Sequence, residues 1–420
     1  MKRKSLLLIV FLTAFTYTAS AQMYIQLTLN EYLERVRKGN LEYAAERLSI
    51  EFADAEIISA SVFNEPSIGL SYYNNELKSM QMGQGGIVEI SKTISPGRRS
   101  AAIQLARGEK ELTTALLTDY FRRLREEATY TWLETVKLRE LFEIRRNSYK
   151  DQIKIMESDS IRRAHINIRD LDALQNKVET GILFSEIIDL ERELYSMYQS
   201  ITNFCGIGGS DTVYIPERKN IWNNKEFNLN QILESAVENR ADIIAALKEI
   251  DVSKYAIKAA KKEKIPEFDI FMGYGFNSEV KNELAPAPRH NGIEFGISIP
   301  IPLSNRGKGE ILSATARRSQ AEIRYSQSVM QVKSEVVNAY NSFLSADKKL
   351  KLFTGGLVRI AKEVLDEKRE EYYNGDIHLI EVMDAQRSYD EILLSFYSTI
   401  YEKSQALVRL ESAIGVWNIE

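Results

Sequence analysis

The chain has 420 residues, a formal net charge of −4 and 27% charged residues. A charge balance without a basic excess argues against a nucleic-acid partner. The chain has a single cysteine, Cys205, so an intrachain disulfide is excluded. With one cysteine and three histidines in total, few ligands are available for a soft transition metal. We therefore expect no metal site and no cofactor, and we expect Cys205 to be a small buried apolar residue.

The first 21 residues have the pattern of a secretory signal peptide. Lys2, Arg3 and Lys4 form a basic start, residues 6–15 are mostly apolar, and Ala19-Ser20-Ala21 offers a cleavage site. The apolar run is too short to span a bilayer as a helix. The sequence therefore predicts an exported protein with a signal peptide at residues 1–21.

The rest of the chain contains the same pattern twice. Residues 27–66 align without gaps with residues 227–266, and Pro66 and Pro266 end both segments. We divide the chain into a first structural repeat at 22–206, a linker at 207–226 and a second repeat at 227–420. Each repeat is expected to contain a helix, a strand pair, a long helix, a tip and a further helix.

The opening helix of each repeat is expected to begin at an asparagine N-cap and to end at a proline. Asn30 and Asn230 are the candidate caps, each after an apolar residue. Helices tolerate the prolines poorly, so both helices are predicted to stop before them.

Strand pairs are predicted at about 67–95 and 268–302, because the hydrophobic period there changes from helical to two. Phe268, Ile270 and Met272 take one face of a strand, whereas Asp269 and Gly273 take the other. A half-buried sheet in a soluble protein would alternate in the same way. The small or polar second face and the predicted export favour an outer-membrane barrel. Four strands cannot close a barrel alone, so the chain would have to oligomerise.

Long proline-free segments follow both strand pairs. Residues 98–156 and 308–373 alternate charged and aliphatic residues, and 336–364 contain a coiled-coil seam with a 4-3 spacing. Sixty helical residues would reach roughly 90 Å. Gly355-Gly356 weakens the second helix locally. Rods of this length suit a channel wall, and they also suit a soluble periplasmic coiled-coil adaptor or scaffold, which stays an alternative.

Three local signatures carry a resemblance to a known family. They are ISKTISPGRRSAAI at 90–103, ISIPIPLSNRGKGEILSA at 297–314 and YYNGDIHLIEVMDAQRSY at 372–389. Together with the repeat and the strand pairs, they make the whole mature chain resemble the TolC family of outer-membrane efflux channels. No signature is a catalytic motif, so no enzyme is expected.

The resemblance implies a mainly α fold with a β membrane part. Three chains would each give four strands to a twelve-stranded β-barrel in the outer membrane, continued by a long α-helical barrel in the periplasm. The implied partners are two further copies, outer-membrane lipid, a periplasmic adaptor and an inner-membrane pump. The channel would conduct passively, and the pump would supply the energy.

The resemblance also assigns residues at the two tips, near 158–171 and 374–380. Glu381 and Asp384 correspond to acids that point into the closed periplasmic entrance, where three copies would form a ring that attracts cations. Asp170 and Tyr372 correspond to two members of a latch. The position of the latch arginine holds Ile377, and Arg169 is a possible substitute.

Six residues of the two tips are predicted to contact the adaptor: His165, Ile166, Asn167, Gly375, Asp376 and Ile377. His165 and His378 could form a metal pair, but no third ligand is evident. An exported hydrolase that uses Glu381 and Asp384 as acid and base is a further alternative. It is disfavoured because no pocket-forming loops surround these carboxylates.

Overall fold

The computed structural model describes the chain from residue 23 to residue 417, except for 77–80, 164–169, 209–210 and 218–225. The side chains of 158–163 and 170–173 are also not described. The predicted signal peptide at 1–21 lies outside the described residues. The chain forms two compact units, one of residues 1–45, 120–239 and 332–420, the other of 46–119 and 240–331.

Six elements form the first half of the chain after its initial strand. In order they are α2 (Leu29–Gly39), α3 (Leu41–Ser61), β2 (Ser67–Asn74), β3 (Gln84–Ile94), α4 (Arg98–Arg163) and α5 (Asp170–Phe204). The second half has the same order of helices and strands, with one interruption: α6 (Leu229–Asn239), α7 (Ala241–Glu263), β5 (Phe268–Asn277), β6 (His290–Ser298), α8 (Lys308–Leu352), the π-helical turn η1 (Phe353–Leu357), α9 (Val358–Asn374) and α10 (Leu379–Ile414).

The opening helix of each half differs from the prediction. The N-cap of α2 is Thr28, whose hydroxyl accepts from the Glu31 N–H while the Glu31 carboxylate accepts from the Thr28 N–H. Asn30 lies inside the helix. Asn40 and Arg240 have extended backbone and divide each predicted opening helix into two. The Asn40 side chain caps α3 by accepting from the Tyr43 N–H at 2.9 Å.

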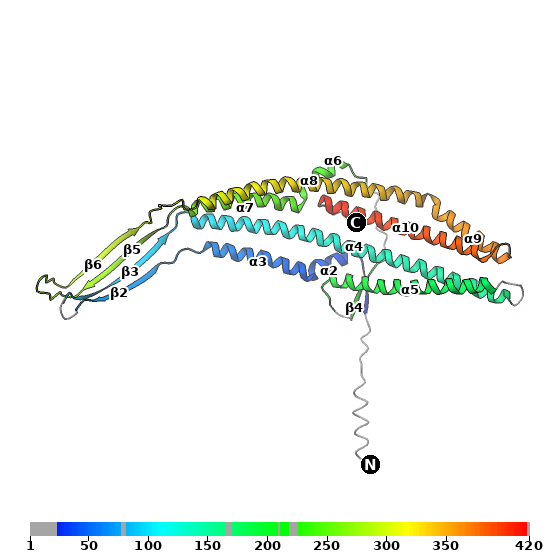
Figure 1. Cartoon of the computed structure of the whole chain (residues 1–420), viewed down its shortest axis with the longest axis horizontal. Coiled ribbons are helices and arrows are strands. Elements are labelled where there is room, and N and C mark those ends of the chain that lie inside the picture. Colours follow the sequence, from blue (N-terminus) through cyan, green and yellow to red (C-terminus); the bar gives the residue numbers. More distant parts are fainter. Residues whose placement is uncertain (1–22, 77–80, 164–169, 209–210, 218–225, 418–420) are drawn as a thin grey trace, which may run out of the picture. The chain divides into compact units, whose positions relative to one another are not determined.

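The predicted long helix over 308–373 is interrupted at the glycine pair that was expected to weaken it. Gly356 has φ 117° and ψ −2° and interrupts the helical backbone between α8 and α9. Such φ values are accessible to glycine because it has no Cβ. Figure 1 shows the bend where α8 passes into α9.

The core of the first unit holds α2 against three longer helices. Tyr32 of α2 is fully buried and stacks on Trp132 of α4, with ring centroids 5.1 Å apart. Ile201 of α5 and Val408 of α10 belong to the same apolar cluster. Cys205 is buried there, as predicted, and burial raises the pKa of its thiol to about 12.

A two-stranded parallel sheet lies beside this core. β1 (Met23–Leu27) pairs with β4 (Thr212–Pro216), in register from Met23 opposite Thr212 to Leu27 opposite Pro216. Neither strand was predicted, and β4 falls in the segment expected to be a linker. Arg35 of α2 covers this sheet, because its guanidinium lies 5.0 Å from the centroid of the Tyr214 ring.

The second unit contains a four-stranded antiparallel sheet in the order β2-β3-β5-β6. The two hairpins, β2-β3 and β5-β6, come from different halves of the chain and join through β3 and β5. Ion pairs tie the helices of this unit, including Lys110 to Asp54 at 2.6 Å and Arg324 to Glu249 at 3.1 Å.

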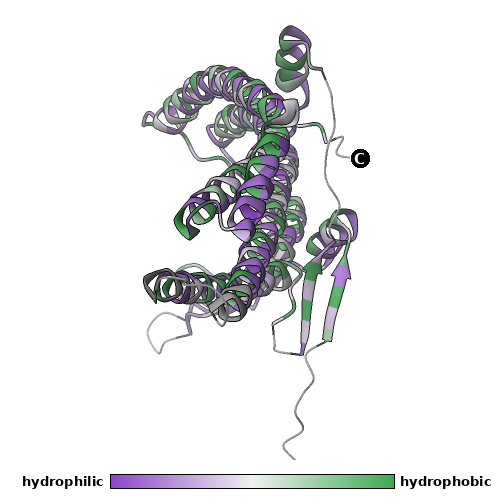
Figure 2. Cartoon of the chain, turned by 90° about the vertical axis from the view of Figure 1, so that its right-hand side faces the viewer, coloured by the Kyte–Doolittle hydropathy of each residue, from purple (hydrophilic) through white to green (hydrophobic). Residues whose placement is uncertain are grey.

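Within the described part of the chain, no helix combines the length and the apolarity needed to cross a membrane. Hydrophilic residues recur along the helices in Figure 2.

Candidate functional site

The turn between α9 and α10 closes through a glycine in the left-handed region. Gly375 has φ 89° and ψ 13°, and its N–H donates to the Tyr372 carbonyl at 3.0 Å. The Asp376 N–H donates to the Glu371 carbonyl at 3.0 Å, so two carbonyls at the end of α9 are satisfied. The chain is then extended at His378, and α10 begins at Leu379. Gly375 and Asp376 are exposed, as an adaptor contact would require.

A small apolar cluster fixes this turn against α4. Its buried members are Ile155, Tyr372, Leu379, Val382 and Met383, and Ile377 packs against it. Ile377 is half-buried. The position that holds an arginine in the resembling channels is therefore part of an apolar contact in this chain.

In the first turns of α10, Glu381 and Asp384 lie on the exposed face of the helix, opposite the face that carries the apolar cluster. A Glu381 carboxylate oxygen lies 3.4 Å from the Lys368 ammonium nitrogen, which also lies 2.9 Å from Glu371. Hydrogen bonds to Glu371 and Glu381 raise the pKa of Lys368 above its ordinary value. Both acids remain largely accessible, with 45% of the Glu381 side chain and 66% of the Asp384 side chain exposed.

One arginine links Asp384 to the neighbouring helix α5. The Arg387 guanidinium donates to both carboxylate oxygens of Glu179, at 3.2 and 2.9 Å, and lies 3.7 Å from Asp384. Glu179 is the larger cause of the raised pKa of Arg387. The acid pair therefore faces solvent with one cation beside each member.

The other predicted tip residues fall at the margin of the described chain. Asp170 is the first residue of α5, but its side chain is outside the described set. His165, Ile166, Asn167 and Arg169 lie outside the described residues. Tyr372 is buried, with 7% of its surface exposed. A contact between Asp170 and Tyr372 stays a prediction.

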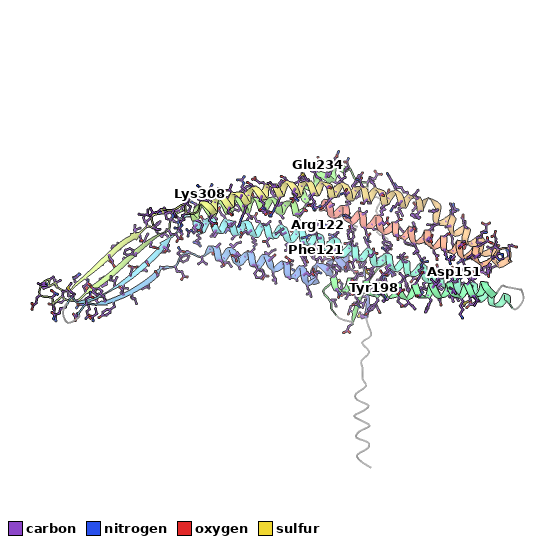
Figure 3. The ribbon with its side chains drawn as sticks, viewed as in Figure 1. Phe121, Arg122, Asp151, Tyr198, Glu234 and Lys308 are labelled. Carbon is purple, nitrogen blue, oxygen red and sulfur yellow. The ribbon has the colours of Figure 1, made fainter. Side chains whose placement is uncertain are left out.

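A buried polar network that the sequence analysis missed lies close to this site. The Arg369 guanidinium donates to Asp151 at 2.7 Å and to Gln386 at 2.6 Å, so it joins α9, α4 and α10. Figure 3 shows Asp151 near the end of α4 that leads to α5. Gln386 and Asp390 are four residues apart in a helix otherwise rich in apolar residues, and this spacing is the one signal in the sequence that could have indicated the network.

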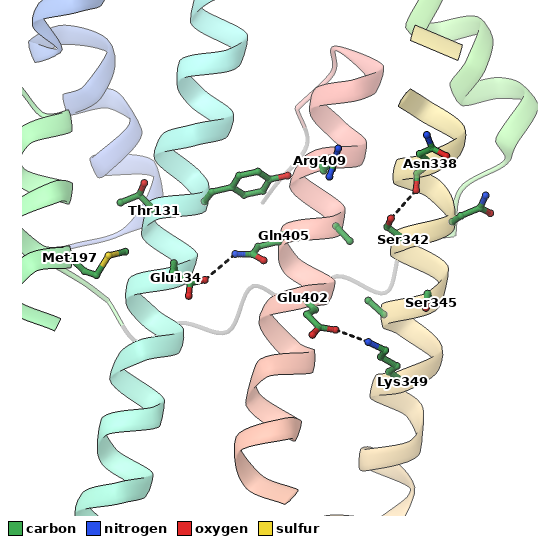
Figure 4. Close-up of a pocket in the computed structure, with 14 residues that line it drawn as sticks. Thr131, Glu134, Met197, Asn338, Ser342, Ser345, Lys349, Glu402, Gln405 and Arg409 are labelled. Carbon is green, nitrogen blue, oxygen red and sulfur yellow. Dashed lines mark hydrogen bonds and ion pairs between the residues drawn. The ribbon is translucent and has the colours of Figure 1, made fainter. Parts of the chain in front are cut away.

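A polar groove of about 1020 Å³ lies between α4, α10 and α8. Gln405 donates to Glu134 across it at 3.3 Å, and Lys349 pairs with Glu402 at 3.1 Å (Figure 4). Eight of the fourteen residues that line the groove are serine, asparagine or charged, so the groove can contact water. Among the described residues, no group of three or more His, Cys, Asp or Glu could hold a metal ion.

Comparison with known proteins identifies the family. The profile described as outer membrane efflux protein matches residues 232–416, which span α6 to α10 and include the whole α9–α10 turn. The chain contains an outer membrane efflux protein domain. The match confirms, for this part of the chain, the predicted resemblance to outer-membrane efflux proteins.

Two curated relatives and one solved structure extend the likeness to this efflux family beyond the matched domain. The cobalt-zinc-cadmium resistance protein CzcC of Cupriavidus metallidurans is 18% identical over 392 residues, which cover 93% of this chain and 90% of the relative. The outer membrane protein TolC of Vibrio cholerae is 22% identical over 244 residues, 56% of this chain and 54% of that protein. The structure of the channel protein CusC superposes with a TM-score of 0.75 at 15% identity, over 96% of this chain and 95% of the other.

The likeness to CusC confirms the predicted fold class, a mainly helical chain with a small β part. The matched profile and this structural neighbour describe efflux and channel proteins, not hydrolases.

Proposed function

We propose that three copies of this chain form an outer-membrane channel that passively conducts substrates delivered by an inner-membrane pump and a periplasmic adaptor. The observation that carries the proposal is the sheet β2-β3-β5-β6, which has one apolar face and two free edges.

The apolar face runs without a break across all four strands. One row across the sheet is formed by Ile68, Ile90, Met272 and Phe295, and the next by Leu70, Val88, Tyr274 and Ile293. All eight side chains are at least 46% exposed. A patch of this extent on a water-soluble protein would be unusual. Lipid on this face would remove it from water.

The other face of the sheet is mostly small and polar, with Ile87 and Phe271 as apolar exceptions. The row between the two apolar rows contains Gly69, Glu89, Gly273 and Glu294. Glycine offers almost no apolar surface to lipid and a carboxylate is unfavourable in lipid, but both suit a water-filled lumen. This difference between the faces argues against the soluble scaffold, which would have no use for an exposed apolar sheet.

The edges of the sheet require further copies. Among the described strands, β2 and β6 each pair on one side only. An unpaired edge in lipid leaves backbone groups unsatisfied, at several kcal/mol each. Pairing β6 of one copy with β2 of the next is a head-to-tail contact that can close into a ring, and three copies give twelve strands.

The helices of the first unit offer a second contact for the same copies. Figure 1 shows α9, α10, α4 and α5 side by side in this unit. On α5, Leu174, Val178 and Ile182 form an exposed stripe at four-residue spacing, and on α9 Ile360 and Val364 are about half exposed. Burial of these stripes between copies would stabilise a helical wall.

The α9–α10 turn supplies the entrance and the adaptor contact in this proposal. Three copies of Glu381 and Asp384 would place six carboxylates around one opening, a ring that favours cations over anions. Gly375, Asp376 and Ile377, with His165, Ile166 and Asn167 of the other tip, would contact the adaptor. Tyr372 and Asp170 would hold the two tips together.

The ring predicts a specific channel behaviour. Glu381→Ala with Asp384→Ala is expected to reduce cation selectivity and block by divalent cations, because the local negative potential is lost. The measurement is the single-channel current in planar bilayers with added Co²⁺, Zn²⁺ or Cd²⁺, the ions for which the relative CzcC is named.

The matched control is Glu363→Ala with Asp366→Ala. These two acids of α9 also stand three residues apart and are 61% and 53% exposed. The control is expected to keep the selectivity and the block of the unsubstituted channel. Equal behaviour of both double variants would refute the entrance assignment.

A further inference from the structure

We propose that Arg369 is the positioning residue that keeps the α9–α10 turn closed against α4, through its ion pair with Asp151 and its hydrogen bond to Gln386. This inference rests on the proposed channel function, and it assigns the closing contact to residues outside the predicted tip latch.

Arg369 lies where three helices meet. Its guanidinium is 2.7 Å from a carboxylate oxygen of Asp151 on α4 and 2.6 Å from the amide oxygen of Gln386 on α10. Its side chain is 18% exposed, whereas the side chains of Arg359 and Glu363, paired on the surface of the same helix, are 69% and 61% exposed. The Asp151 side chain is 32% exposed, so the pair is partly buried, and removal of one partner is expected to cost more than at an exposed surface pair.

The contacts continue from Arg369 to the fourth helix. The Gln386 amide donates to Asp390 at 2.7 Å and to Ser148 at 3.4 Å. Arg145 of α4 lies 3.6 Å from Asp390 and 3.0 Å from Glu186 of α5. Asp390 and Ser148 are each only 4% exposed. The network therefore ties α9 and α10 to α4 and α5 within one copy.

The pKa values of the two acids in this network shift in opposite directions. Burial opposes ionisation of Asp151, but hydrogen bonds from Lys154 and Arg369 outweigh it and hold the pKa of Asp151 below its usual value. Burial raises the pKa of Asp390, opposed by hydrogen bonds from Ser148 and Gln386 and by the charges of Arg145 and Arg369. Without Arg369, both carboxylates would lose their shared cation.

The network is placed to control the turn. Arg369 is one helical turn before Tyr372, and Asp151 is one turn before Ile155, and both of these neighbours belong to the apolar cluster under the turn. Lys368, which contacts Glu381, is adjacent to Arg369. Movement of the turn away from α4 must separate Arg369 from Asp151, and it would carry Glu381 with it.

A double-mutant cycle tests the assignment. Arg369→Gln and Asp151→Asn conserve side-chain size and remove one charge each. Each is expected to raise the single-channel conductance in planar bilayers several-fold, and the double variant is expected to open no further than either single one, because both remove the same contact. Arg359→Gln with Glu363→Gln, the exposed pair on α9, is the control and is expected to leave the conductance unchanged.

Two results would overturn the inference: single variants that conduct like the control, or effects that add in the double variant. Thermal dissociation of the oligomer is measured in parallel, because a purely structural role would lower stability without opening the channel. Absence of any channel from the unsubstituted chain would instead refute the proposed function. Arg369→Lys keeps the positive charge and is expected to retain part of the closure, so its conductance should lie between that of the unsubstituted channel and that of Arg369→Gln. This variant tests the inference if a charge-removing variant does not assemble.

Discussion

At the scale of single residues, two glycines bring the ends of α2 and α5 into backbone contact. A Cβ on Gly39 would lie 2.2 Å from the carbonyl oxygen of Cys205, and one on Gly206 would lie 1.8 Å from the carbonyl oxygen of Gly39. Gly206 also has φ 74°, a backbone conformation that favours glycine. No side-chain rearrangement can relieve a contact with a backbone carbonyl, so any larger residue must separate the two helices.

Gly39→Ala is accordingly expected to destabilise the protein by about 3 kcal/mol, near the upper end for overpacking a core. The measurement is the thermal unfolding temperature of the detergent-solubilised protein. Gly181→Ala in the exposed middle of α5 is the control, since no atom lies within 4 Å of its Cβ position. That change should stabilise the helix by about 1 kcal/mol, and equal unfolding temperatures for both variants would contradict the packing argument.

Some residues of the site follow from the sequence and others do not. The turn at Gly375 could be predicted because glycine is the usual residue for a left-handed helix end. The exposed acids followed from their spacing and from the family resemblance. The contact of Arg369 with Asp151 could not be predicted, because it joins positions 218 residues apart and depends on how α9 packs on α4.

At the scale of elements, the local signals in the sequence that predicted the fold are the two-residue period of the strands and the prolines before them. The period is visible because each strand has one apolar face. β1 and β4 were missed because each has only five residues and its partner lies far away in the chain. The division at Arg240 was missed because arginine is not a usual N-cap and makes no capping hydrogen bond here, whereas Asn40 is a preferred N-cap residue and could have indicated the division in the first half.

The turn η1 between α8 and α9 also depends on a glycine. Gly356 has φ 117°, but the position of its Cβ is open, with only an Arg359 nitrogen near it at 3.9 Å. Any other residue at position 356 would have room for its side chain, but the positive φ would strain its backbone. Such strain costs on the order of 2 kcal/mol.

Gly356→Ala is therefore expected to lower the unfolding temperature or to convert η1 into regular α-helix, which would change the register of α9 against α10. Gly355→Ala, one residue earlier and also without neighbours, should be neutral or stabilising. Amide hydrogen exchange across 350–365 distinguishes the two outcomes. Identical exchange and stability in both variants would show that the positive φ at Gly356 carries no cost.

At the scale of the whole molecule, the proposed channel requires contacts that a single copy of the described chain cannot make by itself. The sheet has two free edges, and the helices of the first unit expose apolar stripes on α5 and α9. Both features call for a neighbour of the same kind, and both fit a head-to-tail contact. In the proposed channel, each of the two units would therefore contribute its own contact between copies.

Val178→Asp on α5 is expected to weaken this interface, because it puts a charge into the centre of the apolar stripe, where 63% of Val178 is exposed in the single copy. Light scattering after size-exclusion chromatography in detergent should show a shift from trimer towards monomer. Val178→Ala keeps the site apolar and should remain trimeric. A trimer of unchanged heat stability in the charged variant would exclude α5 from the interface.

The joining of β3 to β5 also has a consequence for the order of biogenesis. The first hairpin ends at Ile94, and its partner strand begins at Phe268, so more than 170 residues must be exported between them. During that interval the β3 edge and the apolar rows of the first hairpin are exposed to the aqueous periplasm. Non-local strand pairing of this kind is slow and prone to aggregation. If the chain is exported as proposed, the first hairpin would need protection from aggregation from the time it emerges until the second hairpin arrives.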